Sequence, residues 1–275
     1  MATPPPVRKV CRKLVTHGTA CEGTRTIPEE TAVAFTYGSA TFAVMMATPE
    51  YIEDFATGFS LTEGIIEHYS EIKSFDVVHH EHGIEARMTL AGARDDQLLS
   101  RRRRLAGPAG CGLCGIESLD AAVRPAREVK SDLRIGAEVI FSAVGSLREH
   151  QHLNAVTRAV HAAGFWSPVD NRFLAVREDV GRHNALDKLA GVLARAGISP
   201  RHGFIALSSR ISIELVQKAA MIGCPMLVAV SAPTNFALRA AEAAGMTLVA
   251  VAREDSFEIF THPQRVVTVV SNESR

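Results

Sequence analysis

The fold is decided by the stretch GFIALSSRISIELVQKAAMIGCPMLVAV at residues 203–230 and its continuation TNFALRAAEAAGMTLVAV at residues 234–251. Short apolar runs alternate there with amphipathic segments of helical length, and the pattern extends upstream to residues 173–176 and 184–196. The alternation predicts β-α-β units that build a largely parallel sheet covered by helices. The expected apolar strands are 173–176, 203–207, 226–230 and 247–251, and the expected helices are 184–196, 211–222 and 235–244.

The amino-terminal half has a different pattern. Residues 31–47 are rich in β-favouring side chains around Tyr37-Gly38, which predicts a hairpin, and Thr48-Pro49 then opens a helix over 52–59. We therefore expect an α/β protein with a small α+β domain ahead of a three-layer αβα domain. The predicted boundaries are a flexible arm at 1–25, the small domain at 26–105, a cysteine loop at 106–118, the αβα domain at 119–262 and a tail at 263–275.

Composition excludes several classes of protein. The 275 residues are 47% hydrophobic and 22% charged, and 30 Lys and Arg balance 30 Asp and Glu. This balance gives no overall field that would attract nucleic acid or an acidic membrane surface. No apolar run approaches the roughly 18 residues of a membrane span, and the amino terminus lacks a signal core. Five cysteines with one close pair are typical of a reducing compartment, so we expect a cytoplasmic protein.

The close pair lies in Cys111-Gly112-Leu113-Cys114-Gly115, just after the basic run at residues 101–104. The surrounding glycines leave the backbone nearly unrestrained, so this segment can present a thiol instead of burying it. Nearby positive charge lowers the pKa of a thiol and favours the nucleophilic thiolate. The four arginines at 101–104 could supply that charge or bind phosphate. Alternatively, they could be a basic surface segment that contacts only solvent.

Polar turns follow the four predicted strands of the second half. Three of these turns lead into helix amino termini, and the carboxyl edge of an open α/β sheet is where ligands bind. Serine hydroxyls and arginines there favour phosphate, although Ser and Thr are also ordinary helix caps. The candidate binding residues in these turns are Asp179, Arg182, His183, Ser209, Arg210, Ser231 and Arg253.

Other motifs add little. The chain has neither Gly-x-Gly-x-x-Gly nor a phosphate-loop sequence, so any nucleotide is bound in another manner. The group His79, His80 and His82 lacks the second paired ligand set of structural zinc, and we expect surface histidines and no structural zinc. Cys224 is expected to be a buried small hydrophobe, and Cys11 and Cys21 have no motif around them.

Several motifs together resemble those of the FdhD family of formate dehydrogenase accessory sulfurtransferases. The resemblance extends from about residue 28 to 262, and the run from Glu178 to Lys188 is its most specific part. The matching stretches are Phe55 to Ile66, Cys111 to Gly115, Glu178 to Lys188, Ser208 to Ser212 and Ser231 to Thr234.

This resemblance implies a sulfurtransferase that takes sulfur from a cysteine desulfurase and passes it to bis-molybdopterin guanine dinucleotide, carrying molybdenum or tungsten, before insertion into formate dehydrogenase. It implies Cys111 as persulfide carrier with Cys114 as partner, a cytidine deaminase-like large domain and a homodimer. Guanine nucleotide (GDP) would be a partial ligand. The implied cofactor-binding stretch is Val251, Ala252, Arg253, Glu254, Asp255 and Ser256.

Two alternatives stay open. A thiol-disulfide oxidoreductase is suggested by Cys-x-x-Cys alone, and a non-catalytic chaperone would bind the pterin dinucleotide without moving sulfur. The chain also departs from the family pattern at Arg158, where glycine is usual, and at Ala47, where arginine is common. Arg158 leaves the role of His161 open between structure and function.

Overall fold

The computed structural model describes residues 3–91 and 125–268. Backbone contacts divide the chain into two compact units, each assembled from three segments. The first unit comprises Met1–Arg124, Gln151–Ala162 and Arg177–Ala196, and the second comprises Pro125–His150, Ala163–Val176 and Gly197–Arg275. Segments of the two units therefore alternate along the chain, whereas the sequence suggested a single boundary near the cysteine loop. The loop at 106–118, with Cys111 and Cys114, and the basic run at 101–104 lie outside the described residues.

A six-stranded sheet is the centre of the second unit, in the order β13-β12-β11-β10-β8-β9. Strands β10, β11 and β12 are mutually parallel, whereas β8 pairs antiparallel with β10 and β13 antiparallel with β12. The expectation of parallel pairing thus holds for the central strands. The strand bounds are β8 His161–Ser167, β9 Arg172–Asp179, β10 Phe204–Leu207, β11 Met226–Ala229, β12 Thr247–Ala250 and β13 Glu258–Ile259.

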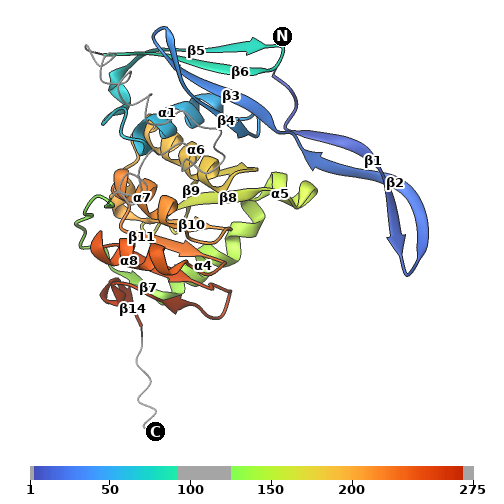
Figure 1. The fold of residues 1–275 in the computed structure, drawn as a ribbon. Coiled ribbons are helices and arrows are strands. Elements are labelled where there is room, and N and C mark those ends of the chain that lie inside the picture. Colours follow the sequence, from blue (N-terminus) through green and yellow to red (C-terminus); the bar gives the residue numbers. More distant parts are fainter. Residues whose placement is uncertain (1–2, 92–124, 269–275) are drawn as a thin grey trace. The chain divides into compact units, whose positions relative to one another are not determined.

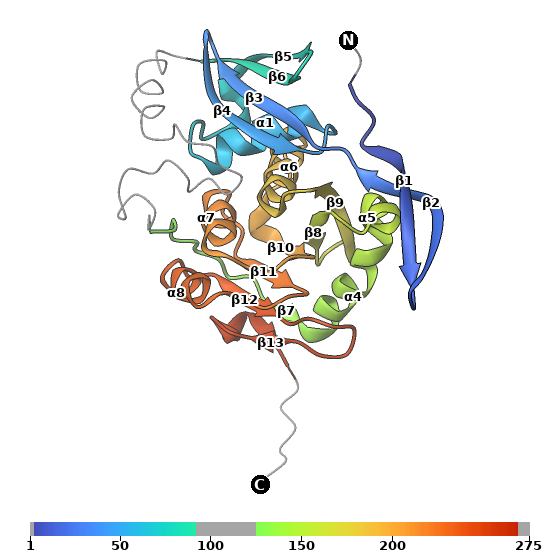
Figure 2. The ribbon, with the colours of Figure 1, turned by 45° about the vertical axis from the view of Figure 1, so that its right-hand side comes forward.

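Helices cover both faces of this sheet (Figure 2). Phe204, Met226 and Val249 belong to one hydrophobic cluster with Ile140 of helix α4 (Ala137–Leu147). The alternate residues Ile205, Leu227 and Leu248 are equally buried, as expected for strands with two covered faces. Helices α7 (Ile213–Met221) and α8 (Asn235–Ala243) pack against each other beside them. The short parallel pair β7 (Ile135–Gly136) and β14 (Val266–Val267) completes the unit.

The first unit contains a four-stranded sheet in the order β4-β3-β6-β5. The predicted hairpin is confirmed, because β3 (Thr31–Tyr37) pairs antiparallel with β4 (Ala40–Ala47). Strands β5 (Ile72–His80) and β6 (Gly83–Leu90) form a second hairpin, and β3 pairs parallel with β6. Phe35 on β3 stacks on Phe59 of helix α1 (Ile52–Thr62), which closes one face of the sheet with an aromatic core.

Helix α6 (Arg182–Arg195) packs directly on α1 within this unit (Figure 1). Glycines bring the two backbones together: a Cβ on Gly58 would lie 1.6 Å from the carbonyl oxygen of Asp187, and one on Gly191 would lie 1.8 Å from that of Asp54. Only glycine fits at either crossing point. Segments that are more than 120 residues apart in the chain therefore share one tightly packed helix pair.

A long two-stranded hairpin precedes the first sheet. Strands β1 (Val7–Thr16) and β2 (Thr19–Pro28) pair antiparallel over ten residue pairs, where the sequence suggested a flexible arm over residues 1–25. Its turn uses His17 and Gly18, both with positive φ. Figures 1 and 2 both show the hairpin extending away from the four-stranded sheet. The remaining helical segments are α5 His152–Thr157 and the 3₁₀ turns Tyr69–Glu71, Arg148–His150, Pro200–His202 and Pro263–Arg265.

Candidate functional site

The carboxyl ends of the three parallel strands form the predicted edge in the second unit. Backbone bonds tie the three turns into one row: Ile211 N donates to Ala232 O at 3.3 Å, and Val251 N donates to Ser231 O at 3.3 Å. The turns after β10, β11 and β12 are therefore neighbours, as the sheet topology required. The structure places Ser209, Arg210, Ser231 and residues 251–256 on this edge.

The turn after β12 holds an unusual backbone conformation. Val251 has φ of 52°, a left-handed value that a β-branched residue rarely adopts. Its neighbour Ala252 is fully buried and donates its N–H to Ala229 O at 3.0 Å, so the chain is fixed on both sides of the strained residue. Strained residues of this kind cluster where a fold positions a functional segment. The conformation directs residues 253–256 into an exposed turn.

Hydrogen bonds to nearby backbone carbonyls hold Arg253 in this turn. Its Nη1 donates to Val230 O at 2.6 Å and to Ala252 O at 2.8 Å, and its backbone N–H donates to Ser256 O at 2.7 Å. The side chain is nevertheless exposed, as are Arg210 and Ser231 on the neighbouring turns. The two guanidinium groups and the hydroxyl are suitable hydrogen-bond donors for phosphate oxygens. The 251–256 stretch also contains two acidic residues, Glu254 and Asp255.

The two helices that begin at this edge are capped differently. Thr234 caps α8 through its Oγ1, which accepts the N–H of Ala237 at 3.2 Å. Ser212 precedes α7 without capping it, and the Oγ atom of this nearly buried serine has no hydrogen-bond partner in the described part of the chain. Ser209 is buried, and its Oγ donates to the carbonyl of Arg210. In the turn after β10, Ser209 therefore bonds the local backbone, whereas Arg210 is the exposed donor.

The motif from Glu178 to Lys188 lies in the first unit, and most of its charged groups have structural partners. The carboxylate of Glu178 accepts the N–H groups of Leu153 and Asn154 at 2.7 and 2.8 Å, so it caps helix α5. Burial raises the pKa of Glu178. Asp179, which we expected to contact a ligand, is fully buried and accepts the N–H of Gly181 and the side-chain amide of Asn184.

The other oxygen of Asp179 ties the amino terminus of α6 to the strand-to-helix turn at Thr48. Asp179 Oδ2 lies 3.0 Å from Thr48 N and 2.6 Å from Lys188 Nζ, and Lys188 also donates to Thr48 O at 2.8 Å. Asp187 accepts a 2.6 Å bond from Thr62 Oγ1. Asp179 therefore acts on any ligand through the position of α6, because its carboxylate has no exposed surface.

Two further cofactor-binding candidates of this motif are Arg182 and His183. They occupy the first positions of α6, whose cap residue Gly181 offers no side chain to the free N–H groups. His161, the first residue of β8, lies near them, and burial together with the charges of Arg182 and His183 lowers its pKa. The first turn of α6 thus presents positive charge and free N–H donors, which favour an anion.

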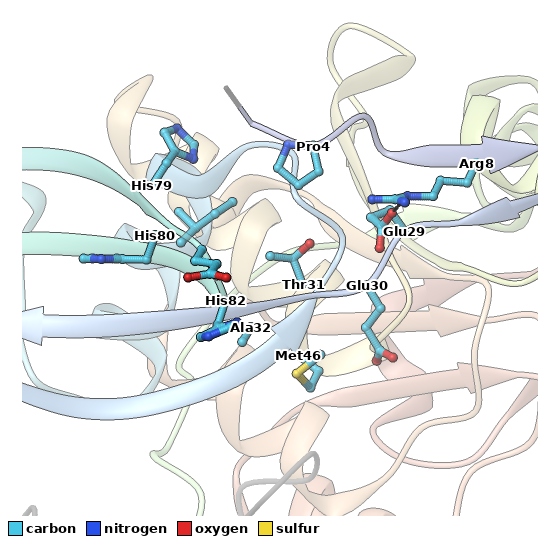
Figure 3. Close-up of a pocket in the computed structure, with 13 residues that line it drawn as sticks. Pro4, Arg8, Glu29, Glu30, Thr31, Ala32, Met46, His79, His80 and His82 are labelled. Atoms are coloured by element: carbon cyan, nitrogen blue, oxygen red, sulfur yellow. Dashed lines mark ion pairs between the residues drawn. The ribbon is translucent and has the colours of Figure 1, made fainter. Parts of the chain in front are cut away.

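A pocket of about 400 Å³ lies elsewhere in the first unit, between the amino-terminal segment and the β5–β6 turn (Figure 3). His79, His80 and His82 all line it together with Glu29 and Glu30. His80 is bonded to Glu85 at 2.9 Å, and the bonds from Arg87 and His80 lower the pKa of Glu85 to about 2. Across residues 3–91 and 125–268, no three His, Cys, Asp or Glu side chains gather in a metal-binding arrangement.

The three described cysteines differ in exposure, and the sequence assigns none of them a role in sulfur chemistry. Cys224 is completely buried, and this burial raises the pKa of its thiol to about 12. Cys11 and Cys21 are exposed and free on the β1–β2 hairpin. The predicted roles of Cys111 and Cys114 stay predictions, since both residues lie outside the described ranges.

The fold and this edge define an α/β protein with a parallel central sheet whose carboxyl edge carries exposed arginine and serine donors. A family model described as the FdhD/NarQ family matches residues 28–267, and the chain belongs to this family. It is 52% identical over 261 residues to a protein named sulfur carrier protein FdhD from Agrobacterium fabrum, covering 94% of this chain and 96% of that protein.

Further relatives agree with this assignment. The sulfur carrier protein FdhD of Brucella abortus is 50% identical over 247 residues, with 90% of this chain and 91% of that protein covered. A crystal structure described as a formate dehydrogenase accessory protein from Desulfotalea psychrophila has the same fold, with a TM-score of 0.76 over 96% of this chain and all of that chain at 23% identity. The expected family and the α/β class are both confirmed.

Sequence reasoning missed the structural role of the motif at 178–188. The signal was present, because Asp179, Asn184 and Lys188 are spaced by five and four residues, as side chains on one side of a helix start are. The sequence pattern identifies their partner Thr48 only as a residue that opens a helix. No local pattern connects positions 131 residues apart, so the network was visible only in the fold.

Proposed function

We propose that this protein carries sulfur as a persulfide on Cys111 and supplies it to the pterin-bound metal of a bis-guanine-dinucleotide cofactor destined for formate dehydrogenase. The observation that carries the proposal is family membership together with Cys111-Gly112-Leu113-Cys114-Gly115 in the sequence. Several relatives at 45–52% identity are named sulfur carriers, and the matched solved structure is described as a formate dehydrogenase accessory protein.

Loading follows from ordinary thiol chemistry. The Cys111 thiolate attacks the outer sulfur of a persulfide on a cysteine desulfurase, the S–S bond of the donor breaks, and the donor cysteine leaves as a thiolate. The product is a persulfide on Cys111. For delivery, its S–S bond would break, the outer sulfur would bond to the metal of the bound substrate and take up two electrons from it, and Cys111 would leave as a thiolate. The Cys114 thiolate, three positions away, could attack the inner sulfur of this persulfide, which would form a 111–114 disulfide and release hydrosulfide. Replacement of Cys114 should therefore impair the carrier only in part.

The carboxyl edge of the second unit supports the docking of a guanine dinucleotide. Arg210, Ser231 and Arg253 present exposed donors there, and Arg253 is held in place by two backbone carbonyls. Charge-assisted bonds from guanidinium groups to phosphate are among the stronger hydrogen bonds in proteins. In the first unit, Arg182 and His183 at the start of α6 stay proposed cofactor-binding residues, and Asp179 positions that helix start.

Calorimetry with GDP and ADP tests the docking edge. We expect GDP to bind the full chain more tightly than ADP and Arg253→Ala to weaken GDP about tenfold, as the loss of one charge-assisted bond implies. Arg239→Ala is the matched control, because this exposed arginine lies within α8 and stacks on Phe236. Equal affinity for the two nucleotides would count against a guanine dinucleotide site.

Activity of formate dehydrogenase in cells that lack this protein separates the proposal from a non-catalytic chaperone. Cys111→Ala should fail to restore activity while still binding GDP normally. Full restoration by Cys111→Ala would favour the chaperone. Restoration that requires Cys114 and a cycling 111–114 disulfide would favour an oxidoreductase. We also propose a cytoplasmic location. We further propose a homodimer, and sedimentation of the purified chain tests this oligomeric state directly. No helix within the described ranges is both long and apolar enough to span a bilayer.

A further inference from the structure

The β1–β2 hairpin has the composition of a binding surface and not of a packed element. None of its residues belongs to the hydrophobic clusters of the two units, and most of its side chains are exposed. A two-stranded hairpin in water is marginally stable on its own. Its described ties to the rest of the first unit are packing of β2 on α5, a bond from Arg25 to Thr157 O, and an ion pair between Arg8 and Glu29.

The charge of the hairpin contrasts with that of the chain. Residues 7–28 carry five basic side chains and one acidic side chain, a net charge of +4, whereas the whole chain is neutral. Lys9 and Lys13 share one face of the ribbon, because their positions are separated by an even number of residues. Arg12 projects from the other face, where it crosses its partner residue Gly23.

Apolar side chains lie at the far end of the same ribbon. Leu14 is 44% exposed and Val15 is 61% exposed, and they precede the His17-Gly18 turn. A solvated strand end has no structural need for two exposed aliphatic residues. A basic stem with an aliphatic tip matches the usual anatomy of a protein interface, in which an apolar centre is bordered by charge.

We propose that the β1–β2 ribbon is a docking arm for a protein partner with an acidic face, which receives the aliphatic tip and pairs with Lys9, Arg12 and Lys13. The positive charge of the ribbon and its lack of aromatic side chains argue against two other binding partners. A second copy of the ribbon would bring two groups of +4 together and is disfavoured. Single-stranded nucleic acid is disfavoured because residues 7–28 contain no Phe, Tyr or Trp on which bases could stack.

This inference rests on the proposed function only for the choice of test proteins, which are the cysteine desulfurase and the formate dehydrogenase that the relay would connect. The experiment measures association and dissociation rates of the full chain with each protein between 50 and 500 mM salt. This range includes 0.1 M, where the Debye length is about 10 Å, so screening of surface charges changes strongly across it. Charges at the border of an interface act mainly on the association rate and on its salt dependence.

The test variant is Lys9→Thr/Arg12→Thr/Lys13→Thr, which keeps β-favouring side chains in the strand. The control is Arg127→Thr/Lys130→Thr/Arg134→Thr, which removes the same charge from exposed positions in the second unit. We expect the ribbon variant to associate about tenfold more slowly with one of the two proteins at low salt and to match the native chain at high salt, as a steering role requires. The control should associate at the native rate.

Leu14→Ser/Val15→Ser provides a second readout, because loss of tip burial should raise the dissociation rate with little change in association. Circular dichroism of each variant verifies that the ribbon persists. Native rates with both proteins for both ribbon variants would overturn the proposal, as would the absence of any salt-dependent complex. Ribbon-dependent binding to a nucleic acid duplex, or ribbon-dependent dimerisation, would overturn it in favour of another occupant. Persulfide loading that fails in the native chain would instead contradict the proposed function.

Discussion

Lys188 Nζ lies 2.6 Å from Asp179 Oδ2, and neither side chain has any exposed surface. The pair joins the start of α6 to the turn at Thr48, since both partners also bond the backbone of Thr48. Asp179 is separated from Thr48 by 131 positions. The motif that carries the family resemblance most specifically therefore has a structural core at Asp179 and Lys188.

Breaking this pair should be costly. Asp179→Asn leaves the Lys188 ammonium buried without its counter-charge, and removal of one partner of a buried pair typically costs about 3–5 kcal/mol in the free energy of unfolding. Urea denaturation measures the loss. The double variant Asp179→Asn/Lys188→Met should be more stable than Asp179→Asn alone, because no unpaired charge remains. Equal stability of the single and double variants would contradict the pairing.

The glycine contacts between α1 and α6 predict a large effect from a single methyl group. Gly58→Ala places a Cβ 1.6 Å from the carbonyl oxygen of Asp187, so the helices must separate, and we expect a loss of about 3 kcal/mol or more from overpacking. Gly145→Ala in α4 is the matched control, since its Cβ meets nothing closer than 3.9 Å. That change should stabilise the protein by about 0.5–1 kcal/mol through helix propensity. Thermal unfolding of both variants decides the matter.

Arg158 occupies a position where the family resemblance leads us to expect glycine. It ends helix α5 with φ of 56° and ψ of 31°, a left-handed conformation that glycine adopts without strain. Arg158→Gly should therefore raise the free energy of unfolding by about 1 kcal/mol, whereas Arg158→Ala, which keeps the strain, should not. A gain in the alanine variant equal to that of the glycine variant would show that the side chain, and not the backbone, is responsible.

His161 predicts a pH dependence with a definite sign. Its pKa is lowered in the folded chain by burial and by Arg182 and His183, so the unfolded chain binds the proton more readily. The contribution of His161 to stability is thus fully present above its ordinary pKa of about 6.5 and is lost as pH falls through its folded pKa. Stability at pH 7.5 and pH 5.5 should differ less in His161→Asn than in the native chain.

Proton NMR of the His161 ring tests the same point directly. A titration midpoint below the ordinary histidine value of about 6.5 is expected. GDP should raise the midpoint of His161 if its phosphates approach Arg182 and His183, because an added negative charge favours the imidazolium. A midpoint at or above that ordinary value would contradict the described environment.

Sequence patterns predicted the elements with strong local signals. The hairpin at 31–47, the three parallel strands and helices α6, α7 and α8 were all expected, because apolar periodicity and turn residues report local structure. The edge formed by Ser209, Ser231 and Arg253 followed from topology once the parallel strands were recognised. The family resemblance supplied the residues of the 251–256 stretch.

Other features depended on contacts that no local pattern contains. Residues 7–28 are polar and rich in Thr, which suggested an arm, but cross-strand pairing over ten positions holds them in a ribbon. The burial of Asp179 arises from Thr48 and Lys188 together, and a charged residue in a turn is ordinarily read as exposed. The strained Val251 has no sequence signal at all, because β-branched residues normally indicate extended strand.

Mass spectrometry of the chain after incubation with a cysteine desulfurase and L-cysteine tests the central claim most directly. The account predicts the added mass of one sulfur atom on the peptide that contains Cys111, sensitive to reductant, present in Cys224→Ala and absent in Cys111→Ala. An added sulfur that survives in Cys111→Ala, or no added sulfur on the native chain, would contradict it.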